Sequence, residues 1–162
     1  IKTRLAEFKD EAQLFGLVRA FPTPSPIGTD AYISMLQRKL TDPCSFIAVA
    51  EQGETLVGYV SGYKHSAFYA AGDTAWVDEI LVLNSERRSG VGRLLMAAFE
   101  SWAVNSGCKL ASLATAGAAD FYLALGYSTK AGYFKGISGH ERVQQVHPAD
   151  VFAFASLRQI RG

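Results

Sequence analysis

The sequence predicts a mixed α/β fold, because its first half is rich in hairpin signals and its second half follows a β-α-β order. In the first half, the apolar runs 45–51 and 55–65 flank a short turn that contains Gly53. In the second half, the strand-like segment 75–83 leads through a helical pattern into a further apolar run, 109–115. Elements in this arrangement pack as a sheet covered by helices.

The N-terminal forty residues contribute one strand and two helices to this prediction. Residues 1–7 alternate in polarity and indicate a strand, which a helical pattern follows. The apolar face of that first helix comprises Phe8, Ala12, Phe15 and Val18. After the breaker-rich loop 22–28, a second helix is predicted over 29–40, with Thr29 and Asp30 as cap candidates. Its apolar face comprises Tyr32, Met35, Leu36 and Leu40.

The longest predicted helix follows the strand 75–83 almost directly. Its apolar residues recur at helical spacing, at Val91, Leu94, Leu95, Ala98, Phe99 and Trp102. A short helix over 118–125, closed by Gly126, and a strand over 127–135 complete the order β-α-α-β-β-β-α-β-α-β. The segment "DVFAFASL", residues 150–157, fits a strand or a helix equally well.

Composition and net charge exclude several classes of function. The chain has 162 residues, 49% hydrophobic and 19% charged, with a net charge of +1, which is typical of one soluble domain. This charge gives no general attraction to nucleic acid or anionic lipid, and no apolar run could cross a bilayer, so we expect neither partner. Cys44 and Cys108 match no metal or redox spacing, which favours a reduced, cytoplasmic setting. Metal-ligand spacing is likewise lacking at His65, His140 and His147.

The segment "RRSGVG", residues 87–92, stands where the longest helix begins. The first turn of a helix has free backbone N–H groups, which bind anions together with the helix dipole. Gly90 and Gly92 leave room for a phosphate group to approach the backbone. Positive charge is supplied by Arg87, Arg88 and Arg93. The pattern predicts a pyrophosphate cradle, and the alternative is a tight turn with solvated charges.

Two other phosphate-binding motifs fit this segment poorly. The nucleotide P-loop requires Lys and then Ser or Thr after its last glycine, whereas Arg93 and Leu94 follow Gly92 here. The dinucleotide fingerprint requires a third glycine, and Leu95 occupies that position.

Three motifs in order resemble the GNAT (GCN5-related) N-acetyltransferase superfamily, over roughly residues 46–135. "RRSGVG" resembles its Arg/Gln-x-x-Gly-x-Gly/Ala signature for acetyl-CoA, and "WVDEILVL" resembles the strand before it. "TAGAADFYLALGY", residues 115–127, resembles its second motif, although Thr115 stands where Asn is common. The resemblance implies a twisted, mostly antiparallel sheet flanked by helices in one domain over 1–136. Residues 137–162 are then a C-terminal extension of unknown role, packed on the same domain.

The resemblance also implies an activity, the transfer of an acetyl group from acetyl-CoA, as cosubstrate, to a primary amine of a small molecule or peptide. The amine attacks directly in a ternary complex, and no metal is expected. The Leu81 amide is implied to stabilise the developing oxyanion, and Leu83 to pair with the pantetheine arm. The full set of implied cofactor contacts is Leu81, Val82, Leu83, Arg87, Arg88, Ser89, Gly90, Val91, Gly92, Arg93 and Thr115.

This chemistry needs a base for the amine proton and an acid for the leaving thiolate. Asp78 and Glu79 are the candidate bases. Neighbours on a strand point to opposite faces, so only one faces the cleft unless a bulge intervenes, and the family position favours Asp78. Tyr122 occupies the family's general-acid position, and a neutral tyrosine can protonate a thiolate. The alternative for Tyr122 is core packing, in a stripe with Ala118, Phe121 and Leu125.

The sequence leaves the acceptor open. The aromatic, loop-like segment 63–76 and the segment 32–35 could wall the acceptor site or belong to the core. Two other functions also fit the chain, an acyl-CoA-binding sensor without turnover and a nucleotide- or phosphate-binding module that uses the arginine-rich turn. The apolar tail could pair with a second chain in a homodimer.

Overall fold

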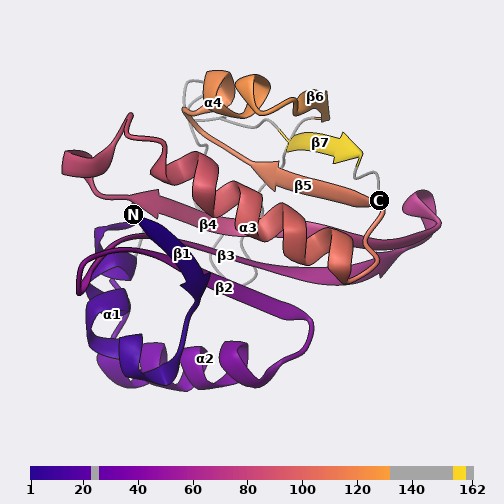
Figure 1. Ribbon diagram of the computed structural model, residues 1–162. Coiled ribbons are helices and arrows are strands. Elements are labelled where there is room, and N and C mark those ends of the chain that lie inside the picture. Colours follow the sequence, from indigo (N-terminus) through magenta and orange to yellow (C-terminus); the bar gives the residue numbers. More distant parts are fainter. Residues whose placement is uncertain (23–25, 132–154, 160–162) are drawn as a thin grey trace, which may run out of the picture.

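The computed structural model describes residues 1–22, 26–131 and 155–159. These residues form one sheet that has helices α1 and α2 on one face and helix α3 on the other (Figure 1). The predicted mixed α/β class is therefore confirmed. Within the described ranges, no helix combines the length and apolar character that crossing a membrane requires.

The seven strands of the described residues lie in the order β1-β2-β3-β4-β5-β7-β6, and only β4 and β5 pair in parallel. Their bounds are β1 (Lys2–Leu5), β2 (Ser45–Gln52), β3 (Thr55–Ala67), β4 (Gly72–Val82), β5 (Leu110–Ala114), β6 (Ser128–Ala131) and β7 (Ala155–Gln159). Strand β7 lies between β5 and β6, so the end of the ambiguous segment 150–157 is a strand. Positions 150–154 lie outside the described residues.

Four α-helices and three short 3-10 helices connect the described strands. They are η1 (Phe8–Asp10), α1 (Glu11–Ala20), α2 (Thr29–Thr41), η2 (Phe68–Ala70), η3 (Asn84–Glu86), α3 (Val91–Asn105) and α4 (Ala119–Ala124). Two hydrophobic clusters lie on opposite faces of the sheet. Leu95 and Phe99 of α3 belong to the first, and Leu14 and Leu36 of α1 and α2 belong to the second.

The apolar face predicted for the first helix is only partly correct, because Phe15 and Val18 pack against the second hydrophobic cluster but are not its most buried residues. Leu14 and Leu17 are buried against the sheet, whereas Ala12 is exposed and Phe8 is half exposed. The physical reason is the 3-10 turn η1, to which Phe8 belongs. Because a 3-10 turn has fewer residues per turn than an α-helix, spacing counted from Phe8 does not predict which α1 residues face the sheet.

The second helix buries Tyr32 and Leu36 as predicted, but it begins differently. Its N-cap is Gly28, with extended backbone, and neither Thr29 nor Asp30 caps it with a side chain. In helix α3, Leu94 is 42% exposed although the periodicity placed it on the buried face. The helix turns Met96 and Ala103 toward the sheet, beside Leu95 and Phe99.

The segment 63–76, expected to be a loop, is instead the end of a long hairpin. Strand β3 continues to Ala67 and β4 starts at Gly72, with only η2 between them. Phe68 is fully exposed at the tip, and Tyr69 is also exposed. Pairing between β3 and β4 from Tyr63 to Trp76 supplies hydrogen-bond partners for the backbone of this segment. None of its residues lines the pocket described below.

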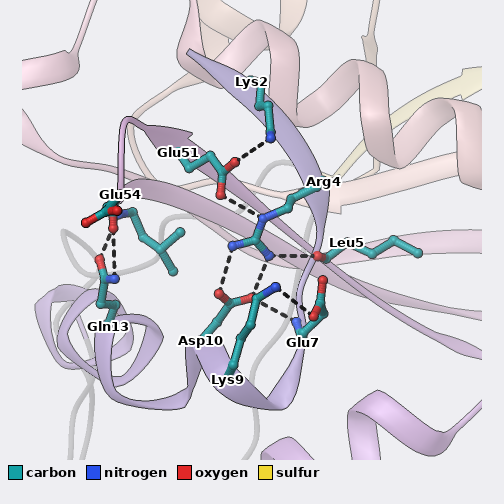
Figure 2. Close-up of polar contacts among 10 residues, drawn as sticks. Lys2, Arg4, Leu5, Glu7, Lys9, Asp10, Gln13, Glu51 and Glu54 are labelled. Atoms are coloured by element: carbon teal, nitrogen blue, oxygen red, sulfur yellow. Dashed lines mark hydrogen bonds and ion pairs between the residues drawn. The ribbon is translucent and has the colours of Figure 1, made fainter.

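A charged cluster joins the first strand to the sheet (Figure 2). The Arg4 guanidinium donates two hydrogen bonds to Asp10, at 2.7 and 2.8 Å, and one to Glu51 at 2.7 Å. Asp10 also accepts from the Glu7 N–H at 2.8 Å, and Lys2 Nζ lies 2.9 Å from the second oxygen of Glu51. We call Lys2, Arg4, Asp10 and Glu51 the Arg4 network. It links β1, η1 and β2 through side chains that satisfy one another.

Candidate active site

The middle of strand β4 contains a bulge. Ser61 of β3 pairs with Glu79, and the next β3 residue, Gly62, pairs with Val77, so Asp78 is an extra residue on β4. Val77 and Ile80 on either side pack into the cluster under α3. The bulge therefore directs both Asp78 and Glu79 to the opposite face, toward α1 and α2, and the simple alternation of a strand does not apply.

The two carboxylates have different partners on that face. Asp78 forms an ion pair with Lys39 of α2, with an Nζ–Oδ2 distance of 3.1 Å. Glu79 accepts a hydrogen bond from the Tyr59 hydroxyl at 2.9 Å, through Oε2. Burial first, and then the negative charge of Glu79, raise the pKa of Tyr59, so the hydroxyl remains a donor at neutral pH. The second oxygen of Glu79 accepts no hydrogen bond from the described residues.

Glu79 lines a pocket of about 180 Å³ between the two N-terminal helices and the sheet. We call it the apolar pocket, because most of its lining residues are aliphatic or aromatic. The lining comprises Leu14, Val18, Phe21, Ile27, Tyr32, Met35, Leu36, Lys39, Ile47, Tyr59, Ser61 and Glu79. The predicted segment 32–35 contributes Tyr32 and Met35 to it, while the side chain of Asp78 is not part of the lining.

Beyond the bulge, β4 presents a free edge. Its parallel pairing with β5 ends at Val77 and Leu113, and no strand of the described ranges pairs with the following residues on that side. The Leu83 N–H points the other way, because it donates to the Val57 carbonyl of the β3 segment at 2.9 Å. Peptide N–H groups alternate along a strand, so that of Leu81 also points to β3, and those of Ile80 and Val82 point to the free edge.

This geometry engages the Leu83 N–H within the sheet, and it favours Val82, which is among the predicted cofactor contacts, and Ile80, which is not. The free donors thus belong to Ile80 and Val82, one position before Leu81 and Leu83. The bulge changes the phase of the strand by one residue, and the sequence carries no clear signal of a bulge at Asp78.

The turn before α3 has a conformation that exposes its backbone. Arg88 and Gly90 have left-handed backbones, with φ of 64° and 89°, and Gly90 is the N-cap of the helix. The Leu94 N–H bonds to the Gly90 carbonyl at 3.1 Å, so the three N–H groups before it, at 91, 92 and 93, have no acceptor within the helix. The side chains of Arg87, Arg88 and Arg93 are exposed around this turn.

The second glycine of this turn serves packing. A Cβ at Gly92 would lie 3.2 Å from the ring of Phe121 on α4, whereas a Cβ at Gly90 would meet no atom within 4 Å. Gly92 thus lets α3 and α4 approach, and Gly90 permits the left-handed turn. Ser89 donates its hydroxyl hydrogen to the Glu86 carbonyl, which closes the turn, and Val91 is buried beneath it.

The remaining predicted residues lie on and before α4. Tyr122 is buried in the cluster under α3, against the rings of Phe121 and Tyr127, and burial raises its pKa to about 12. Thr115 accepts a hydrogen bond from the Ala118 N–H at 3.1 Å, so its hydroxyl supports the local turn. The structure therefore brings Asp78 and Glu79 together, and gives Tyr122 the packed environment that the alternative predicted.

Three residues at this site were missed by sequence reasoning. Tyr59, Ser61 and Lys39 surround the two carboxylates, and none belongs to a recognised motif. The period of two along β3 was a usable signal, because it puts Tyr59 and Ser61 on one face. The ranges that the structure describes contain no cluster of His, Cys, Asp or Glu suited to a metal ion. His140 and His147 lie outside those ranges.

The chain is similar in sequence and in fold to known acetyltransferases. A family model described as "Acetyltransferase (GNAT) family" matches residues 12–127. Glucosamine-6-phosphate N-acetyltransferase from Arabidopsis thaliana has a TM-score of 0.76 and 15% identity, covering 85% of this chain and 98% of that one. Aminoglycoside N-acetyltransferase AAC(6')-Iy, in complex with CoA, has a TM-score of 0.73 and 20% identity, covering 88% and 95%.

A further similar structure is an acetyltransferase of the GNAT family from Streptococcus pneumoniae, with a TM-score of 0.71 and 16% identity, covering 98% of both chains. At these identities the structures establish a common fold. No curated protein matches the sequence.

Proposed function

The chain belongs to the GNAT acetyltransferase family, and from that premise we propose that it is an acetyl-CoA-dependent N-acetyltransferase. The proposed acceptor is a primary amine, which attacks the acetyl group directly in a ternary complex. The observation that carries the proposal is the bulge at Asp78. It places two carboxylates on one face of β4 while leaving the edge of the same strand free for a cosubstrate.

The turn before α3 is the proposed site for the pyrophosphate of acetyl-CoA. Its support is the set of free N–H groups at 91, 92 and 93, the left-handed backbone of Gly90 and the open space at that glycine. Arg87, Arg88 and Arg93 add positive charge. Acetyl-CoA, when bound, supplies an acetyl group activated as a thioester.

The free edge of β4 is the proposed site for the arm and the carbonyl of the cosubstrate. The N–H groups of Ile80 and Val82 point there, and a preorganised backbone N–H is a strong stabiliser of a carbonyl oxygen that gains negative charge. The edge also lies directly beside the bulge, so the same short segment supplies both the hydrogen-bond donors and the carboxylates.

Glu79 is the proposed base. An alkylammonium with a pKa near 10.4 is neutral at pH 7 in only about one molecule in a few thousand, so the proton must be removed. Glu79 lines the apolar pocket and has an oxygen that no described donor occupies, whereas Asp78 is held by Lys39. Tyr59 fixes the other oxygen of Glu79 and thereby orients the carboxylate.

Tyr122 is the proposed acid. With a pKa raised to about 12 by burial, its hydroxyl stays protonated at neutral pH and can give a proton to the departing sulfur. In the complete step, a nitrogen–carbon bond forms and a carbon–sulfur bond breaks. The ammonium gives one proton to Glu79 before the attack, the nitrogen loses a second proton to solvent as the amide forms, and Tyr122 gives one proton to sulfur. Solvent then exchanges protons with both side chains.

Ligand-dependent thermal stability tests this function against its two alternatives. At 100 times its Kd a ligand stabilises a protein by about 2.7 kcal/mol, which raises the Tm of a domain of this size by roughly 5–10 °C. We expect acetyl-CoA and CoA to do so, and ATP and NAD not to. Stabilisation by ATP or NAD alone would identify a nucleotide-binding module. Acetyl-CoA binding without turnover of any amine would identify a sensor.

A matched pair of variants locates the binding site. Gly90→Asn and Gly90→Asp have nearly the same shape, and Asn and Asp are the residues other than glycine that best tolerate a left-handed backbone. Only Asp places a negative charge beside the proposed pyrophosphate. We expect Gly90→Asp to bind acetyl-CoA at least ten-fold more weakly than Gly90→Asn by calorimetry. Equal affinities in two folded variants would rule out the cradle.

A further inference from the structure

The apolar pocket is lined by a buried serine hydroxyl that has no hydrogen-bond partner among the described residues. Ser61 is 4% exposed, and its Oγ has no hydrogen-bond partner among the described residues. Buried polar groups in folded proteins are almost always hydrogen-bonded, so such an atom calls for an explanation. Ser61 lines the pocket, so a molecule bound there would be in a position to supply the missing partner.

Ser61 lies directly opposite the proposed base. It pairs with Glu79 across the β3–β4 ladder, and residues paired in this way have Cβ atoms about 4.5–5.5 Å apart on one face of the sheet. Tyr59, two residues earlier on the same strand, holds one oxygen of Glu79. The other oxygen and the Ser61 hydroxyl are thus two neighbouring polar groups with no described partner.

The rest of the lining determines what kind of molecule fits. The pocket volume of about 180 Å³ is somewhat larger than an engineered cavity of roughly 150 Å³ that binds benzene. Of the twelve described side chains that line the pocket, nine are aliphatic or aromatic. Ser61 and Glu79, two of the other three, are adjacent. A ligand with one polar end and an apolar body matches this distribution.

The charges near the pocket work against a second ammonium group. Besides Glu79, Lys39 is the only charged side chain among the described residues that line the apolar pocket. The carboxylate closest to Lys39, that of Asp78, is already paired with it. A polyamine would therefore find no second carboxylate for its other nitrogen among the described residues that line the pocket.

We propose that the acceptor is a monoamine with an uncharged apolar body of about the size of a benzene ring, and that Ser61 is a substrate-contacting residue. The body occupies the apolar pocket, and the nitrogen lies between the Ser61 hydroxyl and the free oxygen of Glu79. Ser61 accepts an N–H hydrogen bond from the amine while Glu79 takes its proton, which leaves the nitrogen lone pair available. This inference rests on the proposed acetyltransferase function.

The first experiment compares acceptors with full-length protein and acetyl-CoA, by release of CoA thiol. 2-Phenylethylamine and 3-methylbutylamine represent apolar monoamines, and spermidine and glucosamine represent a polyamine and a polar amine. We expect kcat/KM to be at least ten-fold higher for the monoamines. Equal or greater activity with spermidine or glucosamine would overturn the inference and leave the acetyltransferase function standing. No stabilisation by acetyl-CoA would instead remove the function itself.

The second experiment uses Ser61→Ala, with Ser112→Ala as its matched control. Ser112 is another buried serine whose Oγ lacks a partner among the described residues, but it does not line the pocket. Removing a buried hydroxyl that has no partner does not destabilise a fold, so neither variant should lower the Tm. We expect Ser61→Ala to reduce kcat/KM for 2-phenylethylamine roughly ten-fold or more, with the KM for acetyl-CoA unchanged.

Ser112→Ala should behave like the parent protein in both measurements. If Ser61→Ala retains full kcat/KM, or if both serine variants lose activity equally, Ser61 does not contact the acceptor.

Discussion

The Arg4 network and the apolar pocket both place carboxylates beside strands β2 and β3, but their hydrogen bonding differs. In the network, Asp10 receives three hydrogen bonds and each oxygen of Glu51 has a basic partner (Figure 2). In the pocket, Glu79 has one oxygen bound by Tyr59 and the other free of described donors. The neighbouring Ser61 hydroxyl is buried and without a described partner as well.

The difference distinguishes charged groups that stabilise the fold from those that can bind a ligand. In a saturated cluster every carboxylate oxygen already has a partner, and removing a buried member leaves its partner's charge uncompensated. An unsaturated pair contributes little to the fold but can bind a polar group from outside. We therefore expect substitutions in the network to change stability without changing the chemistry, and substitutions in the pocket to do the reverse.

Glu79→Gln should give the largest effect. The amide keeps the shape of the side chain but cannot take a proton at neutral pH, so kcat should fall about 10³-fold, within the usual range for general base catalysis. The Tm should change little. The measurement is steady-state kinetics with an acceptor that the parent protein acetylates.

The control for this variant is Asp78→Asn on the neighbouring residue. It removes a carboxylate of the same bulge that is already paired with Lys39, and we expect a loss of less than ten-fold. Should the two variants exchange these effects, Asp78 would be the base and the contrast between bound and free carboxylates would not identify the catalytic one.

Arg4→Met should give the next largest effect, on stability. It leaves the buried Asp10 without its partner, which should lower the free energy of unfolding by about 3 kcal/mol. Lys2→Met removes a pair whose lysine is 73% exposed, and exposed pairs contribute at most about 1 kcal/mol. Urea unfolding measures both values, and kcat of the folded fraction should equal that of the parent. Equal stability losses would show that burial does not distinguish the two pairs.

The fold was predictable because its signals are periodic and local. The hairpin around Gly53, the helix after the strand 75–83 and the closing Gly126 each follow from a few adjacent residues, and the structure has all three. The faces of the helices were less predictable. The phase of α1 depends on the turn η1, and Leu94 is exposed although its spacing matches that of Leu95.

The candidate site was predictable only where a motif was present. The glycine-rich turn and the acidic pair were found from their spacing, but the bulge that gives the pair its geometry depends on the pairing of β4 with β3. Pairing between strands is a tertiary property, so the predicted contacts included Val82 but missed Ile80, and the oxyanion role was assigned to Leu81. Ser61 is a small polar residue in a buried strand, and only the structure shows that it lacks a partner.

Tyr122→Phe extends the contrast to the other face of the sheet. If the hydroxyl protonates the leaving sulfur, kcat should fall about 10²-fold, while the affinity for acetyl-CoA stays nearly constant because the ring still packs against Phe121 and Tyr127. A core role predicts a lower Tm with kcat unchanged. Parallel measurement of Tm and kcat separates the two, and an unaltered kcat would remove Tyr122 from the mechanism.

The smallest expected effect is the acid sensitivity of the Arg4 network. The hydrogen bonds from Arg4, opposed in part by burial, lower the pKa of the Asp10 carboxyl below its ordinary value. A carboxyl with a lowered pKa in the folded state contributes stability that is complete above its unfolded pKa, near 3.9, and is lost as the pH falls below it. The free energy of unfolding should therefore decline below about pH 4.5.

Asp10→Asn tests this linkage. The variant should be less stable than the parent at pH 7, and its stability should fall less steeply with acid, because it has no carboxyl at position 10 to protonate. The two curves should approach each other as the pH falls through the lowered pKa of Asp10. A residual slope should remain from Glu51, whose pKa is also lowered, by Lys2 and by Arg4. Urea unfolding at pH 7, 5, 4 and 3 measures the curves. Parallel curves would mean that Asp10 has the same proton affinity in the folded and unfolded chains. The charge of Asp10 would then contribute nothing to the stability of the fold. The Arg4 network and the partly unpaired carboxylate of Glu79 could no longer be distinguished by their electrostatics.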